Sequence, residues 1–226
     1  MRVTYSRELS DLAAKLAEMC SRDELAIQLA TQALLEGDIH LAEQVIADAA
    51  VIDIIGEESE KRAFAFLALQ APVAGDLRTV VSGIRISAEL HRMGGLAMHV
   101  ALIVRRRHPE SVLPEPSRGA FADIGKIAVA IAAATRELLV TRDLDIIERI
   151  RVLEDQMNDH HRRLFDMTMD PSWSHGVPAA VDVTLLGRFY ERFADQAVDA
   201  SRRIEFLITG SMPEEGSLRD RDGFSD

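Results

Sequence analysis

Apolar residues recur at helical spacing along almost the entire chain, in six long segments that turn residues separate. The first segment shows this spacing in Leu9, Leu12, Leu16 and Met19, which the 3.6-residue period places on one face of a helix. The three segments of the first half span 7–35, 38–70 and 73–107. Helices of about 30 residues are about 45 Å long, so the pattern predicts an elongated antiparallel bundle.

Turn residues divide the chain into the same order of elements twice. Gly37-Asp38 ends the first segment, and Pro72 interrupts the pattern before the third. In the second half, Asp143 and Asp170-Pro171 play these two parts. The segments of the second half span 124–140, 144–169 and 177–208. Between the halves, residues 109–118 contain three prolines, a composition typical of a linker.

This order predicts an all-α fold of two tandem antiparallel three-helix bundles, six long helices in all, related by a pseudo-two-fold repeat. The first bundle is expected over 1–108, the linker over 109–118, the second bundle over 119–210 and a disordered tail over 211–226. At an offset of 100 residues, the stretch 91–99 aligns with 191–199. The competing interpretation is that any six-helix chain looks periodic.

Composition excludes several functional classes. The formal net charge of −11 leaves no broad basic surface for nucleic acid. No apolar run approaches the ~18 residues that a membrane span needs, and the charged N-terminus has no apolar stretch typical of a signal peptide. Cys20 is the single cysteine, so no internal disulfide can form. We therefore expect a soluble cytoplasmic protein that contacts membranes only through partners.

Acidic residues gather on one face of the last helical segment. Glu191, Asp195 and Asp199 follow each other at i, i+4 and i+8, one turn apart. The preceding segment offers further oxygen ligands that could face the same point: Glu154, Asp155 and Asn158. Carboxylates that face each other across helices hold iron, manganese or magnesium in helical bundles. The alternative is a solvated acidic face whose carboxylates pair with nearby arginines, which the spacing allows equally well.

The aligned face of the first copy carries different residues. His91 and His99 lie two turns apart with Gly95 between them, and Asp48 or Asp53 of the second segment could complete a transition-metal site. Solvated or hydrogen-bonded histidines are the simpler interpretation. No histidine has a glutamate three residues before it, so a ferritin-like di-iron oxidase is disfavoured. No nucleophile or phosphate-loop motif is present, so no catalytic residue is assigned.

Two stretches resemble the PhoU family of phosphate-specific transport regulators. The stretch from Leu69 to Arg78 is similar to that family's Pro-x-Ala-x-Asp-Leu-Arg signature, and Glu191-Arg192-Phe193-Ala194-Asp195 is similar to its Glu-Arg-Ile-Gly-Asp metal motif. The resemblance implies two three-helix bundles that bind iron, zinc, magnesium or manganese, with Glu191 and Asp195 as ligands. It does not carry over to His91 and Gly95, which stand at the motif positions of the first copy.

The resemblance also implies a non-enzymatic function. It implies a cytoplasmic adaptor, often a homodimer, that links the ATPase subunit of the phosphate ABC transporter to the phosphate-sensing histidine kinase. Such an adaptor represses the phosphate-starvation response when phosphate is ample. Two alternatives remain from the residues alone: a carboxylate-rich metal-binding or storage protein, and a purely structural interaction bundle without metal.

Overall fold

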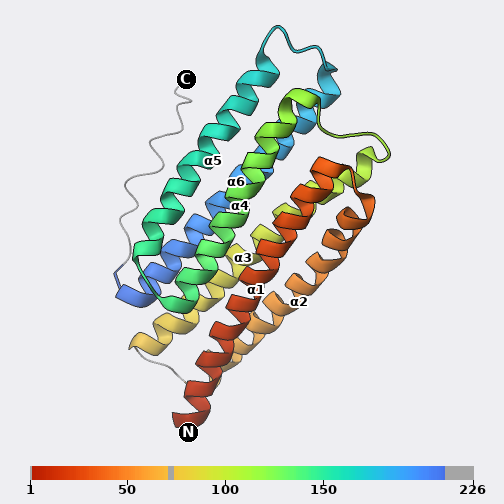
Figure 1. Ribbon diagram of the computed structural model, residues 1–226. Helices are drawn as coiled ribbons and strands as arrows, with labels where there is room; N and C mark the ends of the chain where they lie inside the picture. Colours follow the sequence, from red (N-terminus) through yellow and green to blue (C-terminus); the bar gives the residue numbers. More distant parts are fainter. Residues whose placement is uncertain (1, 71–73, 212–226) are drawn as a thin grey trace.

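Six long helices make up the protein in a computed structural model that describes residues 2–70 and 74–211 (Figure 1). The helices are α1 (Arg2–Glu36), α2 (Ile39–Gln70), α3 (Ala74–Arg107), α4 (Glu115–Thr141), α5 (Asp145–Met169) and α6 (Gly176–Thr209). No strand occurs among the described residues. No helix in that part of the chain combines the length and the apolar character that crossing a membrane requires.

The helices form two antiparallel three-helix bundles side by side, α1–α3 and α4–α6 (Figure 1). In the contact pattern, α1 packs on α4 and α3 packs on α6, while α2 and α5 contact only helices of their own bundle among the described residues. Each inner helix thus meets its counterpart from the other copy, as a pseudo-two-fold repeat requires. The predicted all-α fold of paired three-helix bundles is confirmed.

The two bundles share one core. Buried apolar side chains from all six helices form a single continuous cluster, which includes Ile27 of α1, Leu90 of α3, Ile131 of α4 and Tyr190 of α6. A repeat in the sequence does not show whether the two copies pack together. In this protein each copy buries its inner helices against the other copy. The repeats are therefore halves of one folding unit rather than independent domains.

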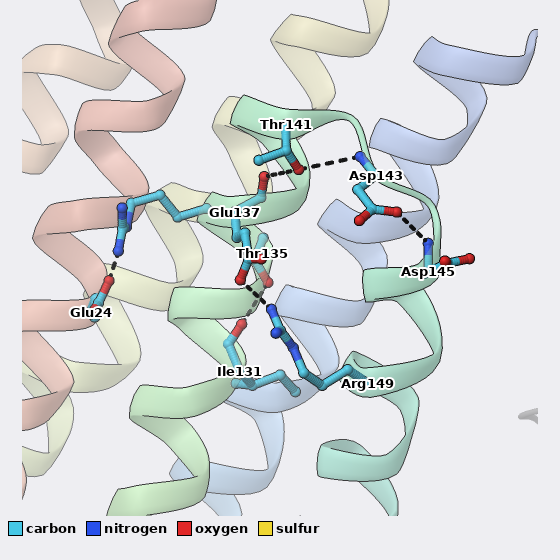
Figure 2. A network of polar contacts seen from close by, with 9 residues as sticks. Glu24, Ile131, Thr135, Glu137, Thr141, Asp143, Asp145 and Arg149 are labelled. Atoms are coloured by element: carbon cyan, nitrogen blue, oxygen red, sulfur yellow. Dashed lines mark hydrogen bonds and ion pairs between the residues drawn. The ribbon is translucent and has the colours of Figure 1, made fainter.

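An aspartate lies in the turn before the second helix of each copy, as predicted. The carboxylate of Asp38 accepts hydrogen bonds from the backbone N–H groups of His40 at 2.8 Å and Leu41 at 3.1 Å. In the second copy, Asp143 accepts one from the N–H of Asp145 at 3.1 Å. Figure 2 shows this turn between α4 and α5, where Arg149 also reaches back to Glu137. The preceding residues, Gly37 and Arg142, adopt the left-handed conformation that reverses the chain (φ +71° and 59°).

The fourth helix begins earlier than the sequence indicated. It starts at Glu115, inside the stretch expected to be linker, and Pro116 lies in its first turn. Proline is compatible with this position because the first N–H groups of a helix have no intrahelical partner. The irregular connection is therefore shorter than 109–118. The expected break at Pro72 and the expected tail after Ser211 lie outside the described residues.

Buried polar groups link the inner helices of the two bundles. The hydroxyls of Thr31 in α1 and Tyr190 in α6 lie 2.8 Å apart, and the Thr31 hydroxyl also donates to the carbonyl of Ile27 at 2.7 Å. Gly125 of α4 allows α1 to approach, because a Cβ atom there would lie 2.3 Å from the Thr31 methyl group.

A second link between the bundles is ionic. The carboxylate of Asp182 in α6 is buried and accepts from Arg106 at 2.7 Å and from Arg107 at 2.6 Å, both at the end of α3. Arg92 of α3 extends the contact toward Gln196 of α6 at 3.5 Å. These pairs join α3 and α6 in antiparallel register at two places.

Candidate metal centre and inter-bundle face

Carboxylates of α5 and α6 gather around Glu154. Its side chain lies in the contact between the two helices and the residue is 6% exposed. Burial and the negative charges of Asp195, Asp155 and Asp199 together raise the pKa of Glu154 to about 7, against the opposing charge of Arg202. The structure therefore brings together three of the predicted α6 and α5 acids with Glu154 at their centre.

Arginines neutralise two members of the acidic face. Arg188 donates to both carboxylate oxygens of Glu191 at 2.5 Å, and Arg202 lies 3.4 Å from Asp199. Both pairs join residues three apart on α6, which places them on the helix surface. Glu191 and Asp199 are therefore paired with arginines, as the alternative interpretation of the sequence predicted.

The chemistry of these oxygen ligands suits a hard cation, but the side chains are not arranged around one point. Oxygen ligands from two facing helices are what magnesium, manganese or iron requires. Asn158 is partly buried on α5, one turn after Glu154, whereas Asp155 is exposed. In the described ranges, no three His, Cys, Asp or Glu side chains surround one point closely enough to hold a metal ion. Binding there requires Glu191 and Asp199 to exchange their arginines for the cation.

The histidines predicted to form a metal site in the first copy contact different neighbours. His91 lies 3.2 Å from Asp53 of α2, and both side chains are more than half exposed. His99 instead contacts the ring of Phe189 in α6, with ring centroids 5.2 Å apart. Partial burial and the charge of Arg192 lower the pKa of His99. Asp48 is partly buried on α2. His91 thus pairs with Asp53 of its own bundle, whereas His99 contacts the other bundle.

Two buried aspartates were missed by the sequence analysis. Asp182 holds Arg106 and Arg107, and Asp23 of α1 is fully buried in the first bundle. A signal was present for Asp23, which lies between Cys20 and Ile27 in the apolar stripe of the first helical segment. Asp182 gave no such signal, because only the packing of α6 against α3 buries it.

Comparison with known proteins places both copies in one family. The PhoU domain model matches residues 16–104 and again 121–204. The chain is 52% identical over 218 residues to the phosphate-specific transport system accessory protein PhoU homolog 1 of Mycobacterium leprae, covering 96% of this chain and 98% of that one. It is 51% identical to homolog 2 of Mycobacterium tuberculosis, covering 94% and 100%.

Solved structures agree on the fold. The phosphate transport system regulatory protein PhoU from Streptococcus pneumoniae superposes with a TM-score of 0.83 at 22% identity, over 93% of this chain and 99% of that one. PhoU from Pseudomonas aeruginosa gives the same TM-score and identity over 92% and 100%. At this identity the likeness concerns the architecture of paired three-helix bundles.

Proposed function

Because this chain belongs to the PhoU family, we propose that it is a regulatory accessory protein of phosphate-specific transport. In this role it acts in the cytoplasm as a non-catalytic adaptor between the ATPase subunit of the phosphate ABC transporter and a phosphate-sensing histidine kinase. It represses the phosphate-starvation response when phosphate is ample. The observation that carries the proposal is the 52% identity to a named accessory protein over nearly the whole length of both chains.

The adaptor role is tested by capture from cells. Tagged protein purified from cells grown at high phosphate should retain the transporter ATPase and a histidine kinase, and capture of one of them should change at low phosphate. Deletion of the gene should raise phosphatase and phosphate-uptake expression at high phosphate. Absence of both partners, together with unchanged expression in the deletion strain, would refute the regulatory role.

An adaptor needs exposed docking surfaces, and apolar side chains are exposed where α5 meets α6. Met169 at the end of α5 is 68% exposed, and Val177 and Val181 at the start of α6 are 75% and 48% exposed. Figure 1 shows this α5–α6 turn at one end of the molecule. Contiguous exposed apolar groups often mark sites of protein association.

Replacing Val177 and Val181 with glutamate is expected to reduce capture of at least one partner tenfold or more. The physical reason is that a charge cannot be buried in an apolar interface without a partner. Val140→Glu is the matched control, because this exposed valine lies at the end of α4. The circular dichroism melting curve should be unchanged in both variants. Equal capture by all three proteins would place the docking surface elsewhere.

Metal binding by the second copy is part of the proposal. Glu154, Asp195 and Asp199 would hold the cation together with Glu191, whose pairing with Arg188 it would replace. The support is the repulsion around Glu154, which a cation would relieve. The family motif at Glu191 and Asp195 supports the same position. Iron, zinc, manganese and magnesium are the candidate metals. As a separate part of the proposal, the protein assembles as a homodimer.

Glu191→Ala combined with Asp195→Ala is expected to lower manganese affinity at least tenfold in titration calorimetry. His91→Ala combined with Asp53→Ala should leave this affinity unchanged.

Because Glu154 must lose its proton to bind a cation, the metal affinity should fall as the pH is lowered through about 7. If the wild type binds none of the four metals, the protein acts as a metal-free bundle. Bound redox metal with turnover would favour a storage protein or metalloenzyme instead.

A further inference from the structure

An acidic side chain lies inside the core of the first bundle. Asp23 of α1 is 0% exposed, and it shares its helix face with the buried residues Cys20 and Ile27. Neither of its carboxyl oxygens has a hydrogen-bond partner among the described residues. Because burying an unpaired carboxylate is far more costly than burying a neutral polar group, this group calls for a chemical explanation.

A glycine provides the space for the carboxyl group. A Cβ atom added at Gly94 of α3 would lie 3.0 Å from the Asp23 Oδ1 and 2.9 Å from the Cδ1 of Ile52 in α2. The carboxyl group therefore lies where α1, α2 and α3 meet. The second copy has no such arrangement: the residue aligned with Gly94 is Ala194, and Ile127 occupies the position on α4 that corresponds to Asp23.

Within the part of the chain that the structure describes, the buried carboxyl group forms no ion pair. Burial raises the pKa of Asp23 well above its usual value. The titratable neighbour on its own helix is Cys20, whose pKa is raised by burial. Glu24 of α1 and Arg136 of α4 pair with each other at 3.1 Å. Gly94 of α3 and Ile52 of α2, which lie beside the same point as the Asp23 carboxyl group, carry no charge.

We propose that Asp23 is a proton-binding site that couples the protonation of one buried carboxyl group to closure of the first bundle. With α1, α2 and α3 closed, the group is a neutral acid. Loss of its proton creates a charge that only water can solvate, so the α1–α3 contact must open. Because α1 and α3 also face α4 and α6, opening reaches the contact between the bundles. This inference stands apart from the proposed regulatory role.

The direction of the pH dependence follows from proton counting. In the closed state the pKa of Asp23 is raised, so the closed protein keeps a proton that an open or unfolded chain releases above a pH of about 4. Stability of the closed state therefore falls as the pH rises through the window between these two pKa values. Within that window the opening equilibrium changes up to about tenfold per pH unit.

Cys20 is a built-in reporter for this opening. It is the only cysteine of the chain, is 1% exposed, and lies one helical turn before Asp23. Its rate of reaction with an aromatic disulfide, divided by the rate for the denatured chain at the same pH, measures the opening equilibrium. From about pH 5 to about pH 8, we expect this ratio to rise with pH in the wild type. In Asp23→Asn, which cannot ionise, the ratio should stay constant.

Asp11→Asn is the matched control, because Asp11 is exposed on the same helix. It should keep the pH dependence of the wild type. Carbon NMR of the Asp23 carboxyl group in the wild-type protein provides a test without any substitution. We expect no titration near a pH of about 4, the ordinary value for aspartate. Titration near that value, or equal pH dependence of Cys20 reactivity in the wild type and Asp23→Asn, overturns the proposal.

Discussion

Replacement of Tyr190 by alanine is expected to lower the free energy of unfolding by about 4 kcal/mol, the range measured for large buried aromatic residues. Tyr190 is fully buried in the shared core, where its ring lies 6.0 Å from that of Phe121 in α4 and its hydroxyl contacts Thr31 in α1. Its removal leaves a cavity that borders both bundles. For a chain of this size the melting temperature should fall by roughly 10 °C.

Tyr190→Phe is the matched control for this prediction. It keeps the ring and removes only the hydroxyl, and Thr31 retains its bond to the carbonyl of Ile27. The cost should be about 1 kcal/mol, the usual net value of one hydrogen bond. Urea denaturation measures both changes. If the alanine and phenylalanine variants lose equal stability, the ring does not carry the contact between the bundles.

Replacement of both arginines at the end of α3 is also expected to lower the free energy of unfolding substantially. In Arg106→Ala combined with Arg107→Ala, the buried carboxylate of Asp182 keeps no cation. An uncompensated buried charge costs about 3 kcal/mol or more. The lower end of the range applies because the Arg106 side chain is 58% exposed, so water already screens part of the pair. Thermal or urea unfolding should show this loss at neutral pH.

Two controls separate the buried charge from the loss of surface arginines. Arg105→Ala removes the adjacent arginine, which lies 3.7 Å from Glu43 in an exposed pair, and should cost less than about 1 kcal/mol. Adding Asp182→Asn to the double variant should recover part of the lost stability, because the buried group is then neutral. A double variant as stable as Arg105→Ala would show that the ionic link contributes little.

The helices and their order were predictable because they depend on local rules. Apolar spacing, the two aspartate turns and the Asp170-Pro171 stop act over a few residues, so they can be read from neighbouring positions. The start of α4 was placed too late for the same reason: proline residues signal a linker, yet Pro116 is compatible with a first helical turn. Local patterns locate helices better than they locate helix ends.

The candidate site was predictable only in part. Spacing alone placed Glu191, Asp195 and Asp199 on one face of a helix, and the structure adds that Glu154 is buried beside that face. Spacing also suggested that His91 and His99 act together, but the structure turns one toward α2 and the other toward α6. The direction of a side chain depends on which helix packs beside it, and this information is not local.

Sequence patterns were enough to show a duplicated set of six helices, because periodicity and turn residues act within each segment. The sequence also indicated the family, and it showed that the face that is acidic in the second copy carries histidines in the first. The packing of the helices showed in addition that the two copies share one core, that Asp182 joins them, and that Asp23 is enclosed with no hydrogen-bond partner among the described residues. Burial and pairing depend on contacts between helices far apart in the chain, such as α1 with α4 and α3 with α6, and patterns of neighbouring residues do not record such contacts.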